Sequence, residues 1–478
     1  MTKEKIPKFF YNLARFATRP MTLQRDELGG VMWTSLCNAR LASIPLVLGT
    51  RVFYVEKSGM EKGYKKLLKE EFGDIDKWEK HLHKYQAVIN KFKEIIKKID
   101  KLKTNDRKEE YYILYKKWLE LFKDFVPFTI TPYTIEKYID PECRNLLQKE
   151  FGNKSEEYFE ILSTPSGLTD FQKMRLEIIE LVLNKKESFN KIVKEYCWYN
   201  EYSFVEPLLD ENYFKTESLK LTLEQAEEEK SKILGNTKNN KEGFSKLIKK
   251  IKNPRLKLLA DIIHTYTFLR TERIDWLKKM QSKIRCIYDL IAKDLSEKTG
   301  KEWNRLEVVY CLNDELLDYI NKGVIPSFES VKSRISNSYI YYKDKKSYLI
   351  SNKKTIKRVV EIVESSEKST EIKGTIAFKG IARGKVSIVW SKLDLEKVKQ
   401  GNILVAKTTM PDYTPAMAVA SAIITEEGGI TSHAAIVARE LKKPCIVGTG
   451  NCMNLLESGD LIEVNANTGI ITILERTK

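Results

Sequence analysis

The hydrophobic pattern of this 478-residue chain changes its period near residue 370. Before that point, apolar residues recur every three or four positions, as in 78–102, which is typical of amphipathic helices. After it, short β-branched runs alternate with Gly, Asn or Asp, which predicts strands separated by turns. Because the two periods occupy separate stretches, we expect two domains of different fold class.

The predicted N-terminal domain is large and all-α, spans residues 1–363 and has room for two subdomains. Its expected helices are 78–102, 111–125, 170–183, 219–234 and 256–295. A cluster of Gly, Asn and Lys at 235–240 predicts a break between helices. The polar run 364–371 has little apolar surface to bury and is expected to be a linker.

The predicted C-terminal domain spans residues 372–478 and is a small α/β domain of the β/β/α type. It holds 10 of the chain's 22 glycines, which indicates many turns. The expected strands are 386–390, 403–406, 422–425, 445–448, 461–464 and 470–474, and the expected helices are 414–420 and 432–441.

Composition narrows the classes of function. The first 370 residues hold 70 Lys and Arg against 55 Asp and Glu, so they carry most of the formal charge of +17 and permit a polyanionic partner. The seven cysteines form no CxxC pair, so we expect no metal site and a reduced, cytoplasmic chain. No stretch has the pattern of a signal peptide or a membrane span, so no membrane partner is expected.

One segment of the C-terminal domain has the pattern of a reactive site. A predicted strand is followed by Gly428 and Gly429, which allow the backbone to approach a ligand closely. Thr431 and Ser432 are residue types that cap a helix, and His433 falls in its first turn. The N–H groups there favour a neutral imidazole and an anion carried on it, as a phosphoryl-accepting nucleophile requires. The simpler alternative is a histidine that only begins the helix.

Residues 374–474 resemble the phosphohistidine swivelling domain of phosphoenolpyruvate synthase, pyruvate phosphate dikinase and related PEP-utilizing enzymes. The segment around His433 and four others carry the resemblance in the family's order: 380–386 (GIARGKV), 401–406 (GNILVA), 410–417 (MPDYTPAM) and 443–449 (KPCIVGT). The resemblance implies that His433 is phosphorylated from a nucleotide or phosphoenolpyruvate and that the domain swings to deliver the phosphoryl group. It also implies a phosphate cradle made of Gly428, Gly429, Thr431 and Ser432.

Two residues of this motif have competing interpretations. Thr431 matches a threonine that is a regulatory phosphorylation site in plant members of the family, but we favour a capping role here. Arg439 lies six residues after His433. It could support the phosphate, while an ion pair to Glu440 or to the scaffold explains it equally well.

A fainter resemblance covers the helical part. Residues 264–273 (HTYTFLRTER) and 308–316 (VVYCLNDEL) resemble the helical substrate domain of rifampin phosphotransferase and similar enzymes. Tyr266, Arg270 and Arg273 share one helix face by their spacing and could contact substrate or phosphoryl oxygens. Salt bridges between helices, involving Glu272 and its neighbours, are the alternative.

We therefore expect a phosphotransferase component with a carrier domain and an acceptor domain. No GxxxxGK[ST] loop occurs, and the chain ends just after the swivelling domain, which leaves no room for a barrel. An ATP-grasp partner is expected to handle ATP and Mg²⁺, with no cofactor bound by this chain itself. A small-molecule acceptor of unknown identity is expected in the helical domain.

Two alternatives belong to other classes. A non-catalytic phosphocarrier or regulatory protein would be labelled without turning over a small molecule. A nucleic-acid-binding protein is suggested by the charge of the helical part. We do not favour it, because lysines on amphipathic helices more often form a solvated face and no RNA- or DNA-binding motif stands out.

Overall fold

The computed structural model describes residues 13–17, 41–45, 51–102, 108–184, 188–200, 207–337, 339–343, 346–350, 372–390, 392–430, 432–450 and 452–477. The chain divides into a helical unit, residues 1–138 and 166–366, and a C-terminal unit, residues 139–165 and 367–478. Residues 139–165, which the sequence analysis assigns to the helical domain, thus group with the C-terminal unit. The expected linker at 364–371 lies outside the described residues.

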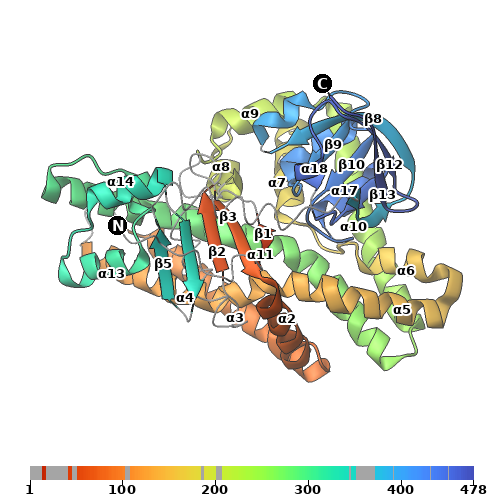
Figure 1. Ribbon diagram of the computed structural model, residues 1–478, viewed down its shortest axis with the longest axis horizontal. Coiled ribbons are helices and arrows are strands. Elements are labelled where there is room, and N and C mark those ends of the chain that lie inside the picture. The colour runs from red at the N-terminus through yellow and green to blue at the C-terminus, as the bar shows by residue number, and fades with distance from the viewer. Residues whose placement is uncertain are drawn as a thin grey trace. The chain divides into compact units, whose positions relative to one another are not determined.

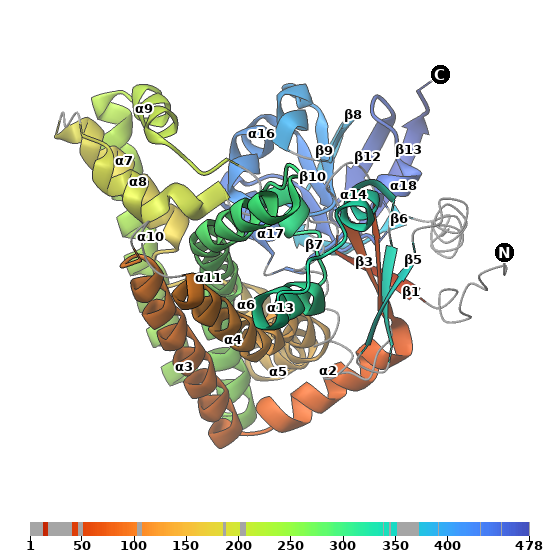
Figure 2. The ribbon, with the colours of Figure 1, turned by 90° about the vertical axis from the view of Figure 1, so that its left-hand side faces the viewer.

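The helical unit consists mainly of amphipathic helices, which confirms the prediction of a mostly helical N-terminal part (Figure 1). Three long helices, α3 (Ile75–Ile99), α4 (Lys108–Thr134) and α11 (Pro254–Thr299), lie side by side (Figure 2). The others are α2 (Lys57–Glu71), α7 (Asp170–Leu183), α8 (Asn190–Tyr196), α9 (Glu211–Leu219), α10 (Leu223–Lys250), α12 (Arg305–Val308), α13 (Asn313–Lys322) and α14 (Phe328–Asn337), with a π-helix at Ile135–Ile139 and a 3₁₀-helix η4 at Cys197–Asn200. Among the described residues, no helix is both long enough and apolar enough to cross a membrane.

Aromatic side chains form the core between the long helices. Trp78 and Phe92 of α3 and Trp118 and Phe125 of α4 are almost completely buried. The lysines of α3 and α4 lie between the buried apolar positions and are exposed or half-buried, so the basic faces of these two helices remain solvated. The 46-residue helix α11 begins at the cap Asn253 and ends at Gly300, whose φ of +67° favours glycine.

The predicted break at 235–240 is wrong, because α10 continues through it. The helix is started by a reciprocal capping box between Thr222 and Gln225. Within the polar stretch, the Thr237 hydroxyl donates to the Ile233 carbonyl, and a Cβ at Gly235 would meet nothing within 4 Å. A glycine inside a helix costs about 1 kcal/mol, and the packing of α10 against α7 offsets this cost.

The helical unit differs from a purely α domain because it also contains an antiparallel five-stranded sheet. Its strand order is β1-β3-β2-β4-β5. The strands are β1 (Leu13–Ala17), β2 (Leu41–Pro45), β3 (Arg51–Glu56), β4 (Tyr339–Lys343) and β5 (Lys346–Ile350). The pairing of β2 with β4 joins segments from the two ends of the unit, which a local sequence pattern does not indicate.

The C-terminal unit contains an eight-stranded sheet of order β6-β13-β12-β8-β9-β10-β11-β7, which confirms the predicted α/β class (Figure 1). Its central strands β8 (Ile381–Val389), β9 (Ile403–Ala406), β10 (Ala422–Thr425) and β11 (Cys445–Val447) are parallel. The remaining elements are α5 (Asp140–Phe151), α6 (Ser155–Leu162), β6 (Ile372–Lys373), β7 (Thr375–Phe378), α16 (Thr414–Val419), α17 (His433–Leu441), α18 (Cys452–Leu455), β12 (Leu461–Asn465) and β13 (Ile470–Glu475), with 3₁₀ turns at Gly152–Lys154, Lys392–Lys397 and Pro411–Tyr413.

Both faces of this sheet are covered. Alternation along β9 sends Leu404 to a core shared with α16 and α17, and sends Ile403 and Val405 to a second core shared with α18. The alanines of α17, such as Ala435 and Ala438, allow the helix to lie close to the sheet. This packing fixes the position of the first residue of α17 relative to the ends of the strands.

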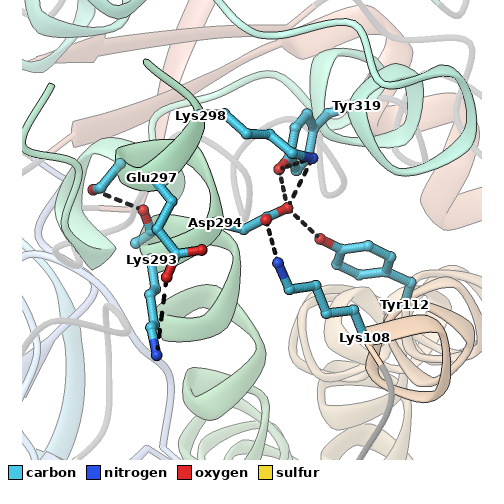
Figure 3. Close-up of polar contacts among 9 residues, drawn as sticks. Lys108, Tyr112, Lys293, Asp294, Glu297, Lys298 and Tyr319 are labelled. Carbon is cyan, nitrogen blue, oxygen red and sulfur yellow. Dashed lines mark hydrogen bonds and ion pairs between the residues drawn. The ribbon is translucent and has the colours of Figure 1, made fainter. Parts of the chain in front are cut away.

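A buried carboxylate joins three helices of the helical unit (Figure 3). Asp294 of α11 is 4% exposed and accepts hydrogen bonds from Lys108 and Tyr112 of α4 and from Tyr319 of α13, with Lys298 on its own helix as a further donor. Burial by itself would raise the pKa of Asp294, but the hydrogen bonds outweigh it and hold the pKa well below its usual range.

We expect Asp294→Asn to lower the free energy of unfolding by about 1–3 kcal/mol near neutral pH. Because the folded-state pKa is depressed, this stabilisation is fully present above the ordinary carboxyl pKa of about 4 and is lost as the pH falls below it. Urea denaturation at about pH 7 and about pH 3 checks this, with the difference between wild type and variant shrinking at the lower pH. Asp318→Asn, at an exposed carboxylate of α13, is the control and should change little at either pH. A difference that is equal at both pH values would contradict the assignment.

Candidate active site

The carboxyl ends of the parallel strands meet at one edge of the C-terminal sheet. Val389 of β8, Ala406 of β9 and Thr425 of β10 lie in register, so each segment that follows a strand begins at the same edge. In sheets of this kind, ligands bind at that edge. The loop that leads from β10 into α17 therefore starts where a ligand would be expected.

His433 is the first residue of α17. Its predecessor Ser432 has extended backbone angles, and the Ser432 hydroxyl accepts a hydrogen bond from the Ala435 N–H at 3.3 Å. Ser432 is buried and His433 is half-buried. The predicted cap is therefore present, and the imidazole sits on the turn where backbone N–H groups favour an anion.

Thr409 holds one ring nitrogen of His433. Its hydroxyl lies 2.8 Å from Nδ1 of the imidazole, and Thr409 itself is 3% exposed. Sequence analysis did not single out Thr409, although it directly precedes the segment 410–417 that carries part of the resemblance. Its position after β9, beside β10, explains how residues 24 positions apart come into contact.

The glycine turn is shaped by close approach of backbone to side chain. Gly428 has a φ of +108°, and a Cβ at this position would lie 2.8 Å from the Cβ of Ser432. The Gly429 carbonyl accepts from the Ser432 N–H at 2.9 Å, which closes the turn before the helix. Both predicted cradle glycines thus lie beside the cap of α17, while Thr431 lies outside the described residues.

Arg439 binds the scaffold of the loop. Its guanidinium donates from Nε to the Ala377 carbonyl of β7 at 3.3 Å and from Nη2 to the Ile430 carbonyl. Ile430 lies three residues before His433, so Arg439 holds the loop that carries the imidazole. These contacts correspond to the scaffold alternative for Arg439.

A buried group of charges lies at the same edge, and sequence analysis missed it. The ammonium of Lys407, which follows β9, lies 3.3 Å from Glu427 Oε1 and 3.9 Å from Glu426 Oε1, both after β10. Glu426 also accepts from the Met453 N–H at 3.0 Å. These contacts tie the ends of two strands together. In the described part of the chain, no group of three or more His, Cys, Asp or Glu side chains could hold a metal ion.

The three candidate residues on α11 of the helical unit lie in different surroundings. The Tyr266 hydroxyl is 2.8 Å from His81 Nε2, within a buried aromatic cluster. Arg270 forms an ion pair with Glu136. Arg273 is 7% exposed. The structure thus gives Tyr266 and Arg270 partners within their own unit.

The segment that contains this site matches a known family. Residues 398–469 match the family model "PEP-utilising enzyme, mobile domain", a stretch that contains the glycine turn, His433 and Thr409. After this match, the C-terminal domain, residues 372–478, is called the mobile domain below. In this mobile domain, His433 begins the helix after the glycine turn.

Two relatives of known family are archaeal proteins described as phosphoenolpyruvate synthases. The "Probable phosphoenolpyruvate synthase" of Methanothermobacter thermautotrophicus is 43% identical over 117 residues, which are 24% of this chain and 17% of that protein. A counterpart from Pyrococcus horikoshii is 37% identical over 182 residues, 37% of this chain and 22% of that protein. The chain thus spans about a fifth of the length of these relatives.

A longer match includes part of the helical unit. The "Uncharacterized phosphotransferase YvkC" of Bacillus subtilis is 25% identical over 338 residues, 66% of this chain and 41% of that protein. Among solved structures, an NMR structure of Enzyme I is 18% identical and covers 45% of this chain and 65% of that chain, with a TM-score of 0.17. That score is too low to support an argument about the fold.

We expect Gly428→Ala to destabilise the mobile domain more than Gly401→Ala does. Both glycines have positive φ, +108° and +84°, but a Cβ at Gly401 would meet nothing within 4 Å. Gly401→Ala should therefore lower the free energy of unfolding by about 1–2 kcal/mol, because only its backbone is strained. Gly428→Ala should lower it further, because the added Cβ also collides with the cap residue Ser432. Thermal unfolding of both variants measures the difference, and equal costs would contradict the close approach.

Proposed function

We propose that this protein is a phosphotransferase component in which His433 carries a phosphoryl group to a small-molecule acceptor bound by the helical unit. The observation that carries the proposal is the contact between Thr409 and Nδ1 of His433 at the N-terminus of α17. Because Nδ1 is hydrogen-bonded to Thr409, Nε2 is the ring nitrogen that can act as the nucleophile. The match to the mobile domain of PEP-utilising enzymes supports the same chemistry.

Thr409 would set the tautomer of the imidazole. When Nδ1 carries the proton and donates it to the Thr409 oxygen, the lone pair is on Nε2. In the first step, Nε2 attacks phosphorus and the bond from phosphorus to the donor's leaving oxygen breaks. In the second step, an acceptor oxygen forms a bond to phosphorus, the N–P bond breaks, and the acceptor hydroxyl loses its proton. Both steps depend mainly on positioning and on charge stabilisation.

The cradle would stabilise the phosphoryl oxygens on His433. The N-terminal N–H groups of α17 and the turn at Gly428 and Gly429 supply partial positive charge without a charged side chain. Arg439 acts as a positioning residue, because it holds the Ile430 carbonyl of the same loop. Such a neutral cradle favours transfer onward, since it does not bind the phosphoryl group as strongly as a ring of cations would.

In this proposal, an ATP-grasp partner binds ATP and Mg²⁺ and supplies the phosphoryl group, with phosphoenolpyruvate as the other candidate donor. The Mg²⁺ would neutralise charge on the donor phosphates. The acceptor is a small molecule in the helical unit. A phosphocarrier without an acceptor is distinguished by whether the label leaves His433 for a small molecule.

We expect His433→Ala to abolish acid-labile, alkali-stable labelling of the protein, measured with ATP and a candidate ATP-grasp partner or with phosphoenolpyruvate. His83→Ala is the matched control, since His83 is an exposed histidine of α3. The chain has four histidines, so few other histidines could carry the label. Label that survives in His433→Ala would refute the carrier assignment.

We expect Thr409→Val to slow labelling of His433 by about tenfold, because the variant keeps the shape of threonine and removes the hydroxyl at Nδ1. Thr409→Ser should restore most of the rate. The measurement is single-turnover labelling, with thermal unfolding as a check that both variants fold. A Thr409→Val protein that is labelled at the wild-type rate would show that the contact does not prepare the nucleophile.

A further inference from the structure

Gln281, in the middle of α11, is a buried amide without hydrogen bonds. Its side chain has no exposed surface, and in the described structure neither Oε1 nor Nε2 has a hydrogen-bond partner. Leaving a buried polar group unpaired is costly, and native proteins rarely do so without a reason. The geometry therefore indicates a partner that is absent from the chain itself.

The neighbours of Gln281 on the same helix face are charged and buried. Asp275, Lys278 and Arg285 are 2%, 3% and 7% exposed, and with Gln281 they fall within an arc of about 120° around α11. Oδ2 of Asp275, on the same face, also has no hydrogen-bond partner in the described structure. Two cations and one carboxyl give the face an excess of positive charge.

Aromatic residues border this face. The Lys278 ammonium donates to the Tyr199 carbonyl of η4 at 3.0 Å and lies 4.5 Å from the centre of the Tyr199 ring. The ring of Trp198 lies 5.6 Å from the ring of Tyr199, measured between ring centres. Polar groups that converge beside aromatic rings are the usual lining of a small-molecule site.

We propose that the face of α11 formed by Asp275, Lys278, Gln281 and Arg285 binds the phosphoryl acceptor, a small molecule that carries an anionic group and a hydroxyl. The Gln281 amide, with Lys278 and Arg285, donates to the carboxylate or phosphate oxygens of the acceptor. Asp275 accepts a hydrogen bond from its hydroxyl, the group that would take the phosphoryl. That the bound molecule is the phosphoryl acceptor rests on the proposed function. The existence of an anion site on this face does not.

The spacing of the four residues suits such a molecule. Asp275 and Gln281 are six residues apart, about 9 Å along the helix, with Lys278 midway between them. Burial raises the pKa of Asp275 to about 7. A carboxyl in this range can take the proton that the acceptor hydroxyl releases.

The test uses the full chain, inorganic phosphate as the probe of the anion site, and chloride at equal ionic strength as the reference. Binding is followed by tryptophan fluorescence, since Trp198 lies against Tyr199, the contact of Lys278, and by thermal unfolding. We expect Gln281→Leu to weaken phosphate binding by about tenfold or more. Without phosphate, the same variant should unfold at a higher temperature than wild type, because the unpaired amide is gone.

Gln86→Leu is the matched control, since Gln86 is an exposed glutamine of α3 that bonds to Asn90. It should bind phosphate as wild type does. Gln281→Met, with an unbranched side chain, serves as a second variant should leucine disturb the packing. Phosphate binding that is unchanged in the Gln281 variants, or absent from wild type, would overturn the proposal and leave Gln281 as the partner of an internal water only.

The binding measurement does not depend on the histidine chemistry. His433→Ala should bind phosphate at the α11 face with unchanged affinity. A protein that is never labelled at His433, but that loses phosphate binding in Gln281→Leu, would refute the proposed function and keep the anion site. A protein that is labelled normally, but whose affinity for phosphate is unchanged in the Gln281 variants, would refute the anion site alone.

Discussion

The parallel pairing of β8, β9 and β10 is the constraint on which the site of the mobile domain depends. It brings the segments after these strands to one edge, so that Thr409 and His433 come within hydrogen-bonding distance. The buried ion pair of Lys407 with Glu427 ties the same strand ends together. A register shift of one residue between β9 and β10 would displace Thr409 relative to the loop that carries His433 and remove its contact with the imidazole.

The two units use charge in different ways. In the proposed function, the mobile domain would stabilise an anion with backbone N–H groups and a glycine turn, and its Lys and Arg exceed its acidic residues by only three. The helical unit instead buries Asp275, Lys278 and Arg285 on one face of a 46-residue helix, beside an amide without partners. If both proposals hold, a carrier that binds the phosphoryl group weakly and an acceptor site with an excess of cations would favour transfer from the carrier to the acceptor.

Much of the fold could be predicted because its signals are local. The strands of the parallel sheet are short apolar runs, and the helix at His433 has both its cap and its glycine turn in one segment. The break at 235–240 was wrong, since the propensity of Gly and Asn is weaker than the packing of α10 against α7. The five-stranded sheet was missed because β2 pairs with β4 from nearly 300 residues away in the sequence.

The sequence by itself determined that a glycine turn, a helix cap and His433 follow one another at the end of a strand, because all of these lie within a few residues. It also determined that the chain changes from helical to strand periodicity near residue 370. Only the tertiary structure decided that Thr409 holds Nδ1 of His433, that Arg439 binds loop carbonyls, and that Gln281 is buried without a partner. Such contacts depend on strand pairing and helix packing over long separations, which no local pattern encodes.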